Sequence, residues 1–487
     1  MLLTIFLGLC FISFLVIYLY LTQSRGTVEN FGLPHIKPFL FFGSPPFLFN
    51  YFVYSDWMID QFKKFGRTWA RYNGIIPCIV TIDPDFIKQV TVKQFDNFTD
   101  VIEWDLPDSE VTLDNSGGNT WRALRKILSP TFTSGKMKGM LEPMDQLAER
   151  TVEYLAEKSK KEKKIDVKPV IQGFALDTIS KCAFGMDTNS YKGEDTEFAV
   201  IAKDVFEQFR ASGWAVTIFF NLMTHFPIII KYLHFWPASA QKIRQMTHDN
   251  IEARIKQNID LGDFIDRLKQ SKAHIEPPVT EPMIDAQGMV FLTAGFETTA
   301  NTLGSAVYLL AKNPEVQDKV LEEVKSICDS SELINHENIK DMHYLEATIM
   351  ETLRMRPPVT EHDRVCTKDC EVKGIKISKG TQIQMPNLPA HMDEEFFPEP
   401  NMFRPERFLK ENTEQVQEFT WRPFGSGNRV CIGQRFAMTE MKIFLAKLIS
   451  KFQIVEVPET KIVPHCGDLF VPFYEKMIVE LEVRENL

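Results

Sequence analysis

The fold is decided by one glycine-punctuated stretch, Pro423-Phe424-Gly425-Ser426-Gly427-Asn428-Arg429-Val430-Cys431-Ile432-Gly433. It carries one thiol, Cys431, with a cation at Arg429 and a helix predicted over residues 434–448. The glycines at 425, 427 and 433 predict turns with positive φ, because glycine adopts that conformation without steric cost. A thiolate in such a loop is typical of a cysteine that binds haem iron. The alternative is a glycine-rich turn around a buried structural cysteine.

Further segments precede this stretch in a fixed order. They are Ala294-Gly295-Phe296-Glu297-Thr298-Thr299, Glu351-Thr352-Leu353-Arg354 and Pro405-Glu406-Arg407-Phe408. With the pattern Phe424-x-x-Gly427-x-Arg429-x-Cys431-x-Gly433, they resemble the haem-thiolate monooxygenases of the cytochrome P-450 family over nearly the whole chain. The run Leu128–Lys136 is similar to that of microsomal members of the vertebrate drug-metabolising and invertebrate detoxification clan.

The resemblance implies a mainly α fold with a small β region, formed by one large helical domain. It implies haem b (iron protoporphyrin IX) as cofactor, with Cys431 as the axial ligand of the iron. The cofactor-binding residues that it implies are Cys431, Trp121, Arg125, Arg364, Arg429, Phe424 and Gly433. Trp121 and Arg125 stand one helical turn apart, a spacing that suits a haem propionate.

A long helix is predicted over residues 280–312, beginning at Thr280 and Pro282 and ending before Asn313-Pro314. Gly295 in its middle costs about 1 kcal/mol relative to alanine, which indicates a local reason for glycine. The resemblance assigns a distorted, oxygen-binding position to this glycine and catalytic proton handling to Thr298 and Glu297. For Thr298 the alternative is a hydroxyl that satisfies its own helix backbone.

Glu351 and Arg354 stand three residues apart, so they lie on one face of a helix and can pair. Arg407 resembles the third member of the family's Glu-Arg-Arg cluster. We expect a structural role for these residues, as a buried charge network behind the haem loop.

The formal net charge of −10 argues against a general nucleic-acid binder. The chain has no G-x-G-x-x-G or Walker loop, so electrons must come from a partner. The resemblance implies an NADPH-cytochrome reductase, with cytochrome b5 as a second candidate donor. Candidates for a basic docking face are Arg122, Lys126, Lys136, Lys138, Arg435 and Lys442.

The N-terminal stretch Met1–Thr22 has no charged residue and is long enough to cross a hydrocarbon core of about 30 Å. It lacks the basic start and small-residue cleavage site of a signal peptide. We therefore expect a transmembrane anchor over residues 1–24, a proline- and glycine-rich linker over 25–46 and the monooxygenase domain over 47–487. The expected location is the endoplasmic reticulum membrane, with the catalytic domain in the cytosol.

The substrate is expected to be a lipophilic small molecule that is a xenobiotic, a steroid or fatty-acid-like. Family members place substrate contacts at positions equivalent to residues 100–116, 206–220, 291, 294, 359–361 and 469–470. The aromatic stretch 206–236 predicts either ordinary core or a lid that dips into a membrane. Glu361 predicts either a site for a cationic substrate group or a solvent-facing turn residue.

Alternative functions with the same cofactor are a haem-thiolate isomerase or dehydratase and a non-catalytic haem- or ligand-binding protein. The intact Glu297-Thr298 pair argues against both. The eight cysteines are scattered without a C-x-x-C pair, which is typical of a reducing compartment. His362, Cys366 and Cys370 stand four residues apart and form a weak alternative metal site.

Overall fold

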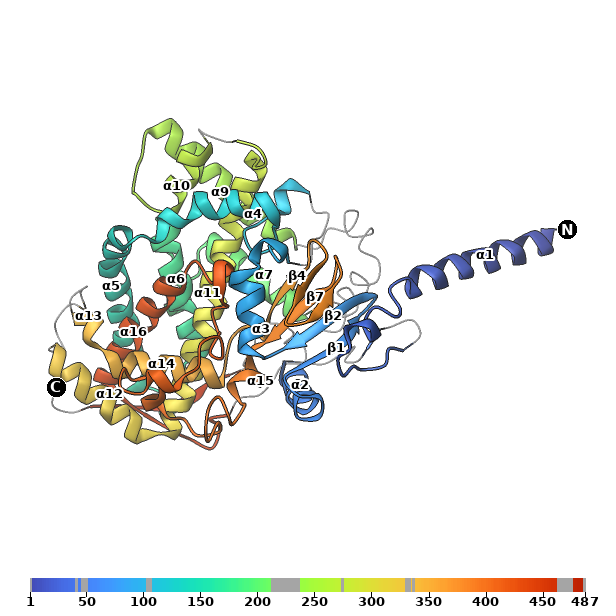
Figure 1. The fold of residues 1–487 in the computed structure, drawn as a ribbon. Helices are drawn as coiled ribbons and strands as arrows, with labels where there is room; N and C mark the ends of the chain where they lie inside the picture. Colours follow the sequence, from blue (N-terminus) through green and yellow to red (C-terminus); the bar gives the residue numbers. More distant parts are fainter. Residues whose placement is uncertain are drawn as a thin grey trace.

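A long helix, α11 (Glu281–Lys312), runs through the middle of the computed structural model, and other large helices surround it (Figure 1). The structure describes residues 2–39, 43–44, 51–101, 107–211, 237–272, 276–328, 334, 338–461 and 476–484. Thr280 is the N-cap of α11, and Asn313 ends it. The predicted bounds of this helix are confirmed to within one residue. Most of its side chains are buried around its whole circumference, as expected for a central helix.

Close packing against α6 (Lys168–Phe184) explains the glycine in the middle of α11. A Cβ atom at Gly295 would lie 2.9 Å from Cδ1 of Ile179. The helix is assigned continuously through Gly295. Gly295 allows the two helices to approach each other, and the oxygen-binding position that the family resemblance implied stays a prediction.

The other helices form the body around α11 (Figure 1). The helix predicted over residues 434–448 is confirmed as α16 (Gln434–Lys451), which continues for three more residues. The helices are α1 (Leu2–Thr22), α2 (Tyr51–Phe65), α3 (Pro84–Lys88), α4 (Gly118–Leu128), α5 (Ser134–Ser159), α6, α7 (Glu197–Ala211), α9 (Ala238–Gln257), α10 (Phe264–Lys272), α11, α12 (Pro314–Ile327), α13 (Asn338–Asp341), α14 (His343–Met355), α15 (Asn387–His391) and α16 (Gln434–Lys451).

A small β region lies to one side of this helical body (Figure 1). Its main sheet has the order β1-β2-β7-β4, in which only the β2–β7 pairing is parallel. The mainly α fold with a small β region is confirmed. The strands are β1 (Thr68–Asn73), β2 (Ile76–Thr81), β3 (Ile165–Asp166), β4 (Glu361–Val365), β5 (Cys370–Val372), β6 (Ile375–Ile377), β7 (Gln382–Pro386), β8 (Phe452–Val455) and β9 (Ile478–Val483).

Helix α1 projects away from the body (Figure 1). Phe6, Phe11 and Val16 are among its exposed apolar side chains. Within the described part of the chain, no helix is both long and apolar enough to cross a membrane. The transmembrane anchor over residues 1–24 therefore stays a prediction, as does the division into anchor, linker and domain.

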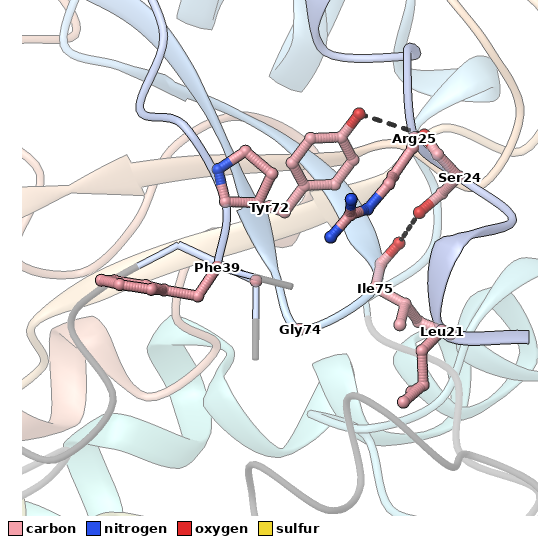
Figure 2. Close-up of a pocket in the computed structure, with 9 residues that line it drawn as sticks. Leu21, Ser24, Arg25, Phe39, Tyr72, Gly74 and Ile75 are labelled. Carbon is pink, nitrogen blue, oxygen red and sulfur yellow. Dashed lines mark hydrogen bonds between the residues drawn. The ribbon is translucent and has the colours of Figure 1, made fainter. Parts of the chain in front are cut away.

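The end of α1 is tied to the hairpin formed by β1 and β2, around a small pocket (Figure 2). The hydroxyl of Tyr72 lies 3.1 Å from the carbonyl oxygen of Ser24 and 3.0 Å from a carboxylate oxygen of Glu29. It also accepts a hydrogen bond of 3.2 Å from the backbone N–H of Val28. Ser24 in turn donates to the carbonyl of Ile75. One buried hydroxyl thus holds the whole segment after α1 against the sheet.

Candidate active site

The cysteine loop depends on two glycines with positive φ. Gly425 and Gly427 have φ of 79° and 66°. A Cβ atom at Gly427 would lie 2.1 Å from the carbonyl oxygen of Thr91, so only glycine fits there. Gly433, the N-cap of α16, has φ of −92°, so its predicted positive φ is wrong. Its place at a helix start explains the difference, because a cap residue needs no left-handed backbone.

Cys431 lies at the end of this loop, directly before α16. Its backbone N–H donates to the carbonyl of Phe424 at 2.8 Å, which closes the loop, and its thiol is accessible. Burial by surrounding protein raises the pKa of this thiol, while the backbone N–H groups of Gly433 and Gln434 and the charge of Arg125 lower it. A helix N-terminus and a cation favour the thiolate, which is the form that binds a metal.

Cations gather near this cysteine. Burial lowers the pKa of Arg364 to about 10 and also lowers that of Arg125. Burial, with help from Arg364, lowers the pKa of Arg429 to about 9. The Nε of Arg364 is buried without a hydrogen-bond partner among the described residues. Buried cations with spare donors fit an anionic group, so these residues fit the haem propionates that the sequence predicts.

Arg429 also has a structural use. Its guanidinium lies 4.6 Å from the ring centre of Trp121, in a cation–π contact. Its Nε donates to the carbonyl of Thr99 at 2.7 Å, and its Nη2 donates to the carbonyl of Ser116. Arg429 therefore fixes both ends of the segment that precedes α4.

Arg422 is a buried residue of this region that sequence reasoning missed. It is 2% exposed, and its Nε and Nη1 find no partner within the described ranges. Burial lowers its pKa to about 9. Its backbone contacts two histidines, since its N–H donates to Nε2 of His391 and its carbonyl lies 3.1 Å from Nε2 of His362. The only sequence signal was an arginine next to the glycine-rich stretch.

On α11, Thr298 is partly accessible and Ala294 is exposed, although most of the helix is buried. The hydroxyl of Thr298 donates to the carbonyl of Ala294 at 2.5 Å. The hydroxyl thus satisfies its own backbone, as the alternative for a mid-helix threonine predicts. Its accessibility keeps it available to another partner.

Glu297 is 1% exposed and faces α6. Nε2 of Gln172 lies 3.2 and 3.3 Å from its two carboxylate oxygens, and Nδ2 of Asn301 lies 3.2 Å from Oε1. Burial raises the pKa of Glu297, while Lys168, Gln172 and Asn301 counteract this. Gln172 and Asn301 were not predicted. Of these two residues, Asn301 could have been found from the sequence, because it stands four residues after Glu297 on the same helix.

The predicted charge network is assembled as expected. Nε and Nη2 of Arg354 donate to Oε2 and Oε1 of Glu351 at 2.7 and 2.8 Å, and both side chains are fully buried. Nε of Arg407 lies 3.3 Å from the same carboxylate. Arg354 also donates to the carbonyl of His391 at 2.8 Å. The network connects α14 with the segments that lead to the cysteine loop.

The predicted substrate contacts fall partly outside the described residues, since positions 102–106, 212–236 and 469–470 are not among them. Phe291 packs in the core, with its ring 3.8 Å from that of Phe264. Glu361 is not a solvent-facing turn residue, because it lies in β4 and accepts hydrogen bonds from Tyr54 at 2.7 Å and Gln384 at 2.5 Å.

The predicted docking face needs one correction. Lys442 is 5% exposed and pairs with Glu346 at 2.9 Å, so it belongs to the core between α16 and α14. For a lysine among apolar neighbours on a helix, the sequence does not show whether the side chain lies on the buried or the exposed face.

The alternative metal site at His362, Cys366 and Cys370 is also not formed. Cys366 and Cys370 are in contact, but His362 bonds to Arg422 and Asn387 instead. Among the described residues, the cluster with metal-binding potential is His248, Glu281 and Asp285. There the ammonium of Lys272 lies 2.9 Å from an oxygen of each carboxylate, so a protein cation already pairs with both.

The chain is similar to known proteins over most of its length. The sequence profile described as Cytochrome P450 matches residues 36–471. Cytochrome P450 3A16 of Mus musculus is 32% identical over 93% of this chain and 91% of its own length. Cytochrome P450 3A6 of Oryctolagus cuniculus is 31% identical over 96% and 94%. Lithocholate 6-beta-hydroxylase of Mesocricetus auratus is 30% identical over 92% and 91%.

Proposed function

Since the chain belongs to the cytochrome P450 family and is a P450 monooxygenase with haem b, we propose that it inserts one atom of dioxygen into a lipophilic small molecule. The observation that carries this proposal is the loop that presents the accessible Cys431 thiol directly before α16, where the cation Arg125 acts on it. A xenobiotic or steroid substrate is favoured, because one relative at 30% identity is named for lithocholate hydroxylation.

The residues around Cys431 would hold the cofactor. When bound, haem b supplies an iron to which the thiolate donates electron density, and this donation favours O–O bond cleavage. Arg125, Arg364 and Trp121 would bind the propionates, and Phe424 and Gly433 shape the loop. Arg422, directly before the glycine-rich stretch, would add a further buried positive charge to this region.

Thr298 and Glu297 would handle protons. The raised pKa of Glu297 lets its carboxyl group take up and release protons nearer to neutral pH than an exposed glutamate. Gln172 and Asn301 fix the carboxyl group in one orientation. The accessible hydroxyl of Thr298, on the next residue of α11, is the group that can pass a proton to the reacting site.

The electrons would come from an NADPH-cytochrome reductase, with cytochrome b5 as a second donor. The chain would be held in the endoplasmic reticulum membrane by residues 1–24, with the body in the cytosol. Exposed apolar side chains on the projecting helix α1 support this arrangement.

The test compares the full-length protein with its Cys431→Ser variant in membranes. The wild-type protein, reduced under carbon monoxide, should show the red-shifted Soret band of thiolate-ligated iron, and the variant should lack it. With added reductase, a lipophilic substrate should stimulate NADPH consumption and yield a hydroxylated product. A thiolate spectrum with peroxide rearrangement but no NADPH use would support the isomerase alternative. Haem binding without turnover of any kind would support the ligand-binding alternative.

A further inference from the structure

Two cysteines that the proposed activity does not use are in contact at one end of the main sheet. Cys366 directly follows β4, and Cys370 begins β5. Their Sγ atoms are 3.7 Å apart. The other cysteines of the described residues form no such pair.

The backbone fixes this contact. The N–H of Cys366 donates to the carbonyl of Thr381 at 2.9 Å, and its carbonyl accepts from the N–H of Gly380 at 2.8 Å. Cys370 is paired with Ile377 in the β5–β6 ladder, and the Cys366 Sγ lies 3.9 Å from the carbonyl of the same Ile377. Both cysteines therefore lie next to Ile377 of the β5–β6 hairpin.

The two thiols differ in access. Cys366 is 1% exposed, and its thiol donates to the carbonyl of Lys368 at 3.0 Å, whereas Cys370 is partly exposed. Burial, followed by the neighbouring Cys370, raises the pKa of Cys366 to about 12. An oxidant from solvent therefore meets Cys370 first, and Cys366 is held within reach of the product.

We propose that Cys366 and Cys370 form a peroxide-sensitive dithiol that closes to an intramolecular disulfide. The Cys370 thiolate attacks hydrogen peroxide, breaks its O–O bond and becomes a sulfenic acid, and hydroxide leaves. The Cys366 sulfur then attacks the Cys370 sulfur, and its proton leaves with the departing hydroxide as water. Together two thiols lose two electrons and two protons, and one peroxide becomes two waters.

Closure requires a small movement. The sulfurs must approach from 3.7 Å to about 2.05 Å, which rotation of the Cys370 side chain and the turn at residues 367–369 can provide. The disulfide would join the end of β4 to the start of β5. It forms with hydrogen peroxide from any source, so the inference does not depend on the proposed monooxygenase activity. Reduction by small thiols should reverse it.

The test uses the purified, folded full-length protein. The protein is reduced, freed of reductant, treated with a small excess of hydrogen peroxide, alkylated with N-ethylmaleimide and digested with trypsin. Cleavage after Arg364, Lys368 and Lys373 separates the two cysteines into peptides 365–368 and 369–373. We expect these peptides to be linked, at the sum of their masses less two hydrogen atoms, and to separate with dithiothreitol.

Two variants and one competing outcome decide the proposal. Cys370→Ser should abolish the linked species, and Cys182→Ser, which removes another buried thiol, should leave its yield unchanged. Recovery of both peptides singly alkylated after peroxide would overturn the proposal. Recovery of Cys370 as sulfinic acid beside an alkylated Cys366 would also overturn it, because the buried thiol would then have failed to resolve the sulfenic acid.

Discussion

At the scale of single residues, the buried carboxyl group of Glu297 depends on neighbours from two helices. Its pKa is raised by burial and restrained by Lys168, Gln172 and Asn301. The amide of Gln172, on α6, lies 3.2 and 3.3 Å from the two carboxylate oxygens. In the proposed proton relay, this carboxyl group has to keep its orientation.

Gln172→Leu should therefore raise the pKa of Glu297 further and disorder its carboxyl group. We expect product formed per NADPH to fall several-fold, with more peroxide released, and the pH midpoint assigned to Glu297 to move upward. Gln146→Leu is the matched control, because Gln146 makes a similar bond to an exposed carboxylate of Glu142. An unchanged pH midpoint in Gln172→Leu would show that Gln172 does not act on Glu297.

His362 is a second residue with a strongly displaced pKa. Burial, with the charges of Arg364 and Arg422, lowers its pKa from 6.5 to about 3. The unfolded chain therefore binds a proton between these values that the folded chain cannot bind. The stability that neutral His362 contributes is present above pH 6.5 and is lost as pH falls toward 3, with a slope of up to about 1.4 kcal/mol per pH unit.

His362→Asn should make unfolding less sensitive to acid in this window, since the substitution removes the group that titrates. Urea unfolding at a series of pH values from neutral to acidic measures the difference. His343→Asn, at an exposed position at the start of α14, is the control. Parallel curves for wild type and His362→Asn would contradict the prediction.

At the scale of elements, the Glu351–Arg354–Arg407 network holds α14 against the segments that lead to the cysteine loop. Arg354→Ala leaves the carboxylate of Glu351 buried, with Arg407 and the backbone N–H of Arg404 as its remaining partners among the residues that the structure describes. We expect a loss of about 3–5 kcal/mol in the free energy of unfolding. Arg404→Ala removes an exposed pair with Glu399 and should cost less than about 1 kcal/mol.

Denaturant unfolding of both variants, each compared with wild type, checks this contrast. Equal losses would mean that the buried network carries no more stability than a surface pair.

Much of this arrangement could be predicted from the sequence, because it follows from local signals. Thr280 and Asn313-Pro314 mark the ends of α11, and the spacing of Glu351 and Arg354 places them on one helical face. Cys431, Glu297 and Thr298 were identified by local motifs as well. Their roles stay predictions, although the structure places their side chains as described.

The remainder depends on contacts between residues far apart in the chain. Gly295 was expected at an oxygen-binding position, which stays a prediction, and its contact with Ile179 adds a packing role that no local pattern shows. Gln172 lies 125 positions from Glu297, and Lys442 is buried because Glu346 lies beside it. Such pairs arise from helix packing, so single-sequence patterns do not reveal them.

At the scale of the whole molecule, the projecting helix α1 divides the chain into a body and an apolar arm (Figure 1). Removal of residues 1–22 should transfer the protein from the membrane pellet to the supernatant of a cell lysate, because the exposed apolar side chains of α1 are lost. The carbon monoxide spectrum should be unchanged, since the cysteine loop lies far from α1 in the fold. A truncated protein that still sediments with membranes would show that another surface binds lipid.

The clamp around Tyr72 bears on how such an arm could carry its body. A free chain after α1 would let the body tumble above the bilayer, but the hydroxyl of Tyr72 holds Ser24, Val28 and Glu29 against the sheet. In a chain anchored as proposed, the tilt of α1 in the lipid would therefore fix the tilt of the body, and one side of the protein would always point to the lipid headgroups. The proposed electron donor would then have to approach from a restricted range of directions.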